Sequence, residues 1–189
     1  MKKLYFIDTE TTGVTIGKSR IVQVSFKLEN DETNASKSFD FKLKPKNFDD
    51  PSIYEKSAIE KTGYTMDVVA GLPPEDEAFE KIRSVFNRVV DVSKFGDKMF
   101  FVGFNSRFDY DFLRAWFEEK KDNFWYFFYP DVDMMRVVAF LFMDSRSKFK
   151  KFTLEGVAEA IGIKVESEKL HDSMYDVELV QEIYHKIVG

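Results

Sequence analysis

Cysteine is absent from the 189-residue sequence, so no disulfide holds the fold and no thiol takes part in chemistry. Long apolar runs are also lacking, and the longest, residues 137–143, is too short to cross a bilayer. The apolar stretch that follows the basic residues 2–3 stops at Asp8, too early for a signal peptide. We therefore expect a soluble, cytoplasmic protein that does not associate with membranes.

An excess of positive charge is missing as well. The chain has 28 Lys and Arg against 33 Asp and Glu, which gives a net charge of −5. A protein that holds nucleic acid through its own charge alone is usually basic. Either this protein does not bind nucleic acid, or bound metal cations supply the positive charge locally.

The residues that are present predict one α/β domain over residues 1–189. Hydrophobic residues make up 44% of the chain, and no repeat or linker divides it. Apolar patterning predicts strands over residues 4–7, 21–26, 39–43 and 99–102. It predicts helices after Pro73–Pro74 and over about residues 108–120, 134–143, 154–161 and 173–187. Strands first and strand–helix units later indicate a mixed sheet flanked by helices.

Two carboxylates follow the first predicted strand. Side chains two apart in a strand point to the same face, so Asp8 and Glu10 lie side by side. Adjacent carboxylates repel each other unless a cation lies between them, and hard oxygen ligands favour magnesium or manganese. An Asp-x-Glu pair is common, however, and by itself it indicates a solvated end of a strand.

Two further segments carry acidic residues at helix starts. Asp109 falls in the first turn of the helix that follows the strand at 99–102, where the helix dipole favours an anion. His171 comes just before a helix that begins near Asp172, and Asp176 lies one turn inside it. Taken alone, Asp109 is equally well explained as a first-turn acid, and His171 is better explained as a surface-loop residue.

Together the three segments resemble the DEDDh branch of the DEDD exonuclease superfamily, which includes the proofreading subunits of bacterial replicative polymerases and ribonuclease T. The order and spacing match over nearly the whole chain. The first motif is matched by residues 6–13, the second by 102–105, 108–109 and 112–113, and the third by His171 and Asp176. The sequence departs from the pattern at Phe104 and Val180, and neither position is a ligand in the family.

The resemblance implies a ribonuclease H-like fold with a mixed five-stranded sheet flanked by helices. It implies a 3′→5′ exonuclease that hydrolyses DNA from the 3′ end and releases 5′-nucleoside monophosphates. Two Mg²⁺ ions, replaceable by Mn²⁺, are expected on Asp8, Glu10, Asp109 and Asp176, with Asp8 bridging them. His171 is expected to take a proton from the attacking water, since a histidine titrates near neutral pH.

The same resemblance implies a pocket for a single-stranded 3′ end. Thr11, Thr12 and Gly13 are expected to hold the terminal nucleotide through backbone amides and hydroxyls. Asn105 and Phe108 are expected to line the same pocket, although Phe108 is better explained as a core residue.

Other signals are weaker. Residues 124–129 are six consecutive aromatics, which suit base stacking but are better explained as a strand or loop packed on the core. A basic stretch either contacts substrate phosphates or is a solvated loop; it comprises Arg146, Lys148, Lys150 and Lys151. We expect Asp133 to act as a cap or ion-pair partner and not as a ligand, and we expect His185 to be exposed.

Two alternatives stay open. An RNA-directed exonuclease of the same family would carry the same motifs, because selectivity depends on how the pocket treats the 2′-hydroxyl. A non-catalytic subunit that docks on a polymerase is disfavoured by the five filled catalytic positions. The chain ends at Gly189 soon after the last motif, so we expect a stand-alone enzyme, with a polymerase partner or a homodimer still open.

Overall fold

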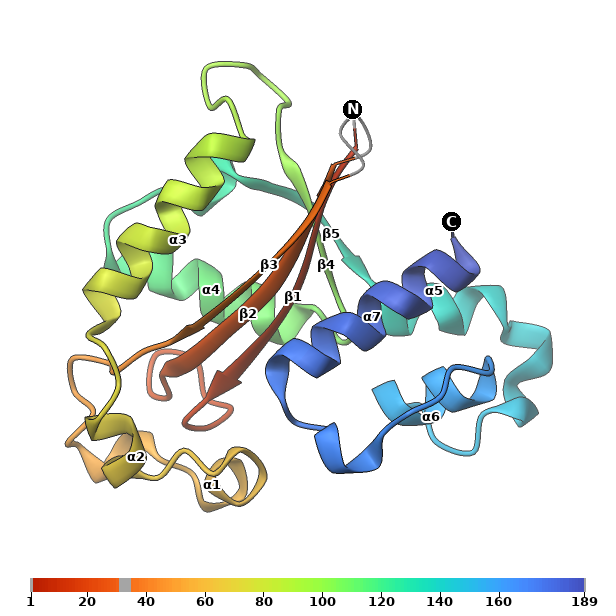
Figure 1. Cartoon of the computed structure of the whole chain (residues 1–189), viewed down its shortest axis with the longest axis horizontal. Helices are drawn as coiled ribbons and strands as arrows, with labels where there is room; N and C mark the ends of the chain where they lie inside the picture. Colours follow the sequence, from red (N-terminus) through yellow and green to blue (C-terminus); the bar gives the residue numbers. More distant parts are fainter. Residues whose placement is uncertain (1, 31–34, 189) are drawn as a thin grey trace.

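One five-stranded sheet forms the centre of the molecule (Figure 1). The computed structural model describes residues 2–30 and 35–188. The strands are β1 (Lys3–Thr11), β2 (Ile21–Asn30), β3 (Ala35–Lys42), β4 (Met99–Gly103) and β5 (Phe128–Asp133), in the order β3-β2-β1-β4-β5. The first three are antiparallel, whereas β1, β4 and β5 are parallel. This arrangement confirms the predicted mixed five-stranded sheet.

Helices cover both faces of the sheet (Figure 1). One face carries α3 (Glu75–Val89) and α4 (Arg107–Glu119). The other carries α5 (Met134–Leu141), α6 (Leu154–Ala160) and α7 (Ser173–Ile187). Two short helices, α1 (Lys56–Thr62) and α2 (Met66–Ala70), lie beyond the end of β1 and β2. Because β1, β4 and β5 are parallel, their carboxyl ends lie at the same end of the sheet. Helix α1 lies next to this end (Figure 1).

The alternation of side chains along β1 decides which core each residue joins. Tyr5 and Ile7 are buried with α3 and α4, while Leu4 and Phe6 are buried with α5, α6 and α7. Continued for three more residues, this period of two puts Asp8 and Glu10 on the α7 face of the strand and Thr9 on the α4 face.

Several strand boundaries differ from those predicted, since β2 continues to Asn30 and β3 begins at Ala35. β1 runs on to Thr11 because Asp8 and Glu10 still pair with Ser25 and Gln23 of β2. Asp8 and Glu10 therefore lie within the paired part of β1 and not beyond its end. β5 is the fifth strand and lies at the edge of the sheet. The sequence alone left open whether this segment forms a strand or a loop.

The aromatic run at residues 124–129 is divided between core and surface. Phe124, Phe127 and Phe128 are buried in the core with α3 and α4, as predicted. Trp125, Tyr126 and Tyr129 are exposed, so the prediction that the run packs on the core is wrong for this half. Tyr129 belongs to β5, which has a neighbour only on its β4 side, whereas Trp125 and Tyr126 lie in a short 3-10 turn before that strand.

The basic stretch lies away from the strand end that carries the carboxylates. Arg146 donates to the Phe149 carbonyl at 2.7 Å and lies over the Phe152 ring. Lys148, Lys150 and Lys151 line a separate surface hollow beside α6.

His185 is exposed as expected, with its Nε2 3.0 Å from Glu29. Within residues 2–30 and 35–188, no helix is long and apolar enough to span a membrane.

Candidate active site

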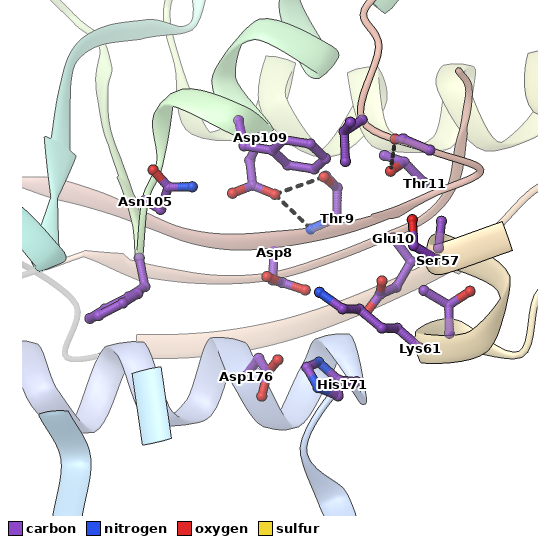
Figure 2. A pocket seen from close by; sticks show the side chains of 16 residues that line it. Asp8, Thr9, Glu10, Thr11, Ser57, Lys61, Asn105, Asp109, His171 and Asp176 are labelled. Atoms are coloured by element: carbon purple, nitrogen blue, oxygen red, sulfur yellow. Dashed lines mark hydrogen bonds between the residues drawn. The ribbon is translucent and has the colours of Figure 1, made fainter. Parts of the chain in front are cut away.

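A pocket of about 270 Å³ opens at the carboxyl end of β1 (Figure 2). The five predicted catalytic residues all line it: Asp8, Glu10, Asp109, His171 and Asp176. They come from three elements that are far apart in sequence, namely β1, α4 and the segment that enters α7. The tertiary structure thus brings together the three segments that the sequence singled out.

Asp8 and Glu10 provide the floor of the pocket from β1. The pKa of Asp8 is raised well above its ordinary value, first by burial and then by the charges of Asp109, Glu10 and Asp176. The pKa of Glu10 is raised to about 8 by burial and by the charges of Asp176 and Asp109, and Lys61 acts in the opposite direction. Both carboxyls therefore lie in a region that resists further negative charge.

Asp109 faces the same pocket from the first turn of α4 and is only 4% exposed. Its Oδ1 accepts two hydrogen bonds from Thr9, one from the backbone N–H at 2.9 Å and one from the hydroxyl at 2.7 Å. Burial raises the pKa of Asp109, and the two bonds from Thr9 oppose that rise. Sequence reasoning missed Thr9. Its position between the two acids, on the opposite face of the strand, is the signal that could have identified it.

The start of α7 closes the pocket from the other side. Asp172 caps the helix by accepting from the Tyr175 N–H at 3.0 Å, and Asp176 follows in the first turn. Burial raises the pKa of Asp176 to about 6. The buried Ser173 hydroxyl donates to the Asp8 carbonyl at 3.0 Å and so ties α7 to β1. Sequence reasoning also missed Ser173, because a serine in the first turn indicates only the start of a helix.

His171 lies at the pocket edge in the turn that precedes α7. Its backbone has a φ of 68°, in the left-handed region, and its side chain is exposed. Figure 2 shows the ring beside Asp176 and opposite Glu10 and Lys61. An exposed imidazole at the rim of an acidic pocket is placed to exchange protons with water that enters it.

The turn after β1 contributes part of the pocket wall. Thr11 and Gly13 line it, as predicted, and the Thr11 hydroxyl donates to the Gly13 carbonyl at 2.6 Å. Thr12 does not line it: its side chain is buried, and its hydroxyl accepts from the Arg20 N–H at 2.9 Å. This corrects the expectation that the Thr12 hydroxyl faces the pocket. The register between β1 and β2 shifts after Glu10, and Thr12 lies beyond the end of β1, so strand alternation no longer predicts where its side chain points.

The opposite wall comes from the start of α4. Asn105 and Phe108 both line the pocket, as predicted, and Phe108 also packs against the core. Asn105 has a φ of 60°, and its N–H donates to Asp133 Oδ1 at 2.9 Å. Asp133 also caps α5 by accepting from the Met135 N–H at 3.0 Å. Asp133 therefore has the capping role predicted for it and supports the loop that carries Asn105.

Helix α1 supplies pocket residues that the sequence did not reveal: Ser57, Ala58, Lys61 and Thr62. No motif marks them, because the segment at residues 49–71 has mixed composition and its helices are short. Only the tertiary structure brings α1 to the end of β1.

The donor set suits a hard divalent cation. Four carboxylates face one pocket, and Asp176 Oδ1 is buried without a hydrogen-bond partner among the described residues. A cation there would relieve the repulsion that raises the pKa of Asp8 and Glu10. Within the described part of the chain, no three Asp, Glu or His side chains already converge as tightly as a formed metal site requires. Binding would therefore need these side chains to rotate toward one another.

Comparison with known proteins gives one family match. The family model RNase_T, described as "Exonuclease", matches residues 5–184 and so covers the whole site. No match is found among curated proteins.

Solved structures of exonuclease I share the fold. The zinc-bound E. coli ExoI–ssDNA complex has a TM-score of 0.74 at 21% identity, over 100% of this chain and 40% of that one. The E. coli complex with a dT13 oligonucleotide has a TM-score of 0.75 at 21% identity, over 100% and 41%. The ExoI/SSB-Ct complex has a TM-score of 0.74 at 19% identity, over 99% and 41%. The chain thus spans about two fifths of the length of these structures.

Proposed function

Because this chain belongs to the RNase_T family of exonucleases, we propose that it is a metal-dependent hydrolase that removes nucleotides from the 3′ end of DNA. Its products would be 5′-nucleoside monophosphates. The observation that carries the proposal is the convergence of Asp8, Glu10, Asp109, Asp176 and His171 on one open pocket.

The four carboxylates would hold two Mg²⁺ ions, with Mn²⁺ as a substitute. Their mutual repulsion, the burial of Asp109 and the unpaired Oδ1 of Asp176 support this assignment. Bound divalent ions would activate water as a nucleophile and neutralise charge on the scissile phosphate. Thr9 would keep the Asp109 carboxylate oriented, since it donates twice to the same oxygen.

His171 would act as the general base. Its exposed ring lies at the pocket rim, where it can accept a proton from a water molecule that attacks the phosphorus. The left-handed backbone at residue 171 turns the chain into α7, which fixes the spacing between His171 and Asp176.

The 3′-terminal nucleotide would lie between two walls of the pocket. One is the turn with Thr11, Gly13 and the exposed Val14, and the other is the start of α4 with Asn105 and Phe108. The half-buried Phe108 ring offers an apolar surface for a base or sugar, and Asn105 offers a polar group beside it. A pocket this small suits a single-stranded end, because a duplex end would have to fray to enter it.

DNA is the substrate we favour. The solved structures of exonuclease I include complexes with ssDNA and with DNA oligonucleotides, and this supports the choice. An RNA-directed activity stays the alternative, and a polymerase partner or a homodimer stays a prediction.

A labelled-oligonucleotide time course tests the proposal. Single-stranded DNA and RNA of matched sequence, each labelled at the 5′ end, would be incubated with Mg²⁺, Mn²⁺ or EDTA. We expect a metal-dependent ladder that shortens from the 3′ end of DNA. Faster shortening of RNA would transfer the proposal to the RNA-directed enzyme, and absence of any ladder would leave only a binding role.

The matched variant pair is Asp8→Asn and Asp49→Asn, the second being an exposed carboxylate outside the pocket. Asp8→Asn should abolish the ladder, and Asp49→Asn should retain it. Equal activity of both variants would contradict the assignment of the site.

A further inference from the structure

Lys61 brings a positive charge to a pocket that is otherwise acidic. It lies in the last turn of α1 and is the only Lys or Arg among the described residues that line the pocket. Figure 2 shows its side chain reaching across the opening, between Glu10 and Asp8 on one side and His171 on the other. Within the described chain it has no ion-pair partner within 4.0 Å, whereas Lys56 of the same helix pairs with Glu60 at 3.6 Å.

Both ends of α1 are anchored, so the location of Lys61 is a property of the fold. At the start, the Glu55 N–H donates to the Thr12 carbonyl at 2.7 Å, and the Glu55 carboxylate accepts from the Val14 N–H at 3.1 Å. Just after the helix, the buried Tyr64 hydroxyl donates to Gln23 Oε1 at 2.7 Å. Gln23 is the β2 partner of Glu10, so this end of α1 is held beside the carboxylates.

The charges in the pocket suggest a function for the Lys61 ammonium group. Lys61 acts on Glu10 through its charge, so it lies within electrostatic range of the carboxylates. A phosphodiester brings one more negative charge into a site that already has four carboxylates. An ammonium group on a flexible stem that is not committed to an ion pair is suited to meet that charge.

We propose that Lys61 binds the phosphate of the 3′-terminal nucleotide, the group at which cleavage would occur, and so helps to select nucleotides over uncharged nucleosides. This inference rests on the proposed function and adds a substrate-binding residue to it. Ser57, one turn earlier on the same face of α1, lines the same wall of the pocket.

Calorimetric titration with thymidine 5′-monophosphate and with thymidine, in the presence of Mg²⁺, tests the proposal without turnover. The proteins compared are the wild type, Lys61→Gln, Lys61→Arg and the control Lys56→Gln. We expect Lys61→Gln to weaken monophosphate binding about tenfold, the scale of one charge-assisted hydrogen bond, and to leave thymidine binding within about twofold. Lys61→Arg should retain most of the affinity, and Lys56→Gln should match the wild type.

Several outcomes would overturn the inference. Equal weakening of monophosphate and thymidine binding would make Lys61 a structural residue. Unchanged monophosphate binding, or no monophosphate binding by the wild type, would remove the phosphate role. A changed Mg²⁺ affinity with unchanged discrimination would make Lys61 a counter-ion of Glu10. Because no cleavage is needed, these results stay distinct from a failed oligonucleotide assay, which would contradict the proposed function.

Discussion

The hydroxyl and the backbone N–H of Thr9 both donate to the same oxygen of Asp109, at 2.7 and 2.9 Å. Thr9 is on β1 and Asp109 on α4, a separation of 100 residues. The pair joins the strand that carries Asp8 and Glu10 to the helix that carries the third carboxylate. It therefore sets the distance across the pocket and holds Asp109 in one orientation.

Replacing Thr9 by Val should impair the site while preserving the volume of the side chain. The variant loses the hydroxyl donor, so Asp109 is less firmly oriented and its pKa rises further. We expect kcat to fall by about 10- to 100-fold and the Mg²⁺ concentration for half-maximal activity to rise. Thr9→Ser, which retains a hydroxyl, is the control. If Val and Ser variants were equally active, the hydroxyl would have no part in orienting Asp109.

The metal-free protein should lose stability as pH rises. Glu10 and Asp176 have pKa values raised to about 8 and about 6, so the folded state favours their protonated forms. The stabilisation from these two carboxyls is fully present below about pH 4, where both are protonated in the folded and in the unfolded state. It is lost as pH rises through 6 to 8. Denaturant titrations in EDTA between pH 4 and 8 measure this. A free energy of unfolding that rose over this range would contradict the raised pKa values.

Adding Mg²⁺ at pH 8 should reverse that loss, because a cation that binds only the folded state stabilises it. In EDTA at the same pH, Asp8→Asn should be more stable than the wild type, since it removes one member of a repelling set. The variant should also gain less stability from Mg²⁺. A melting-temperature series with and without Mg²⁺ compares the two proteins. A wild type that is indifferent to Mg²⁺ would argue against a metal site.

The two histidines of the chain form a matched pair for testing the general base. His171→Asn should lower kcat by about 100-fold or more, the usual scale for a positioned base. Asn is chosen because it tolerates the left-handed backbone at this position better than most residues. His185→Asn, on the exposed side of α7, should be nearly as active as the wild type. Similar kcat values for the two variants would remove His171 from the mechanism.

A side chain at Gly13 should disturb the turn after β1. A Cβ there would lie 2.5 Å from Glu55 Cδ and 2.5 Å from Ser19 Oγ. Glu55 would have to move, which breaks its bond from the Val14 N–H and loosens the turn against α1. We expect Gly13→Ala to raise KM about fivefold, equivalent to roughly 1 kcal/mol, with a smaller effect on kcat. Gly71→Ala, where a Cβ meets its nearest neighbour at 3.6 Å, is the control and should leave KM unchanged.

Local pattern was sufficient for much of the fold. Apolar alternation and helix-start residues identified four of the five strands in part, and the helices that cover the sheet. The boundaries were less accurate: β1 continues to Thr11 because pairing with β2 persists beyond the apolar stretch. The fifth strand was ambiguous because at the sheet edge only Phe128 of its aromatic residues is buried, while Tyr129 is exposed. Edge strands lack the continuous apolar pattern that predicts a central strand.

The sequence by itself determined the acidic residues, their order and the histidine before Asp176, because these are chemical types at fixed spacings in three short segments. It also determined that Asp8 and Glu10 share a face, since that follows from the period of a strand. Only the tertiary structure decided that Thr9 supports Asp109, that Thr12 turns away from the pocket and that Lys61 reaches into it. Each of these depends on contacts between elements distant in the chain, for which spacing along the sequence carries no signal.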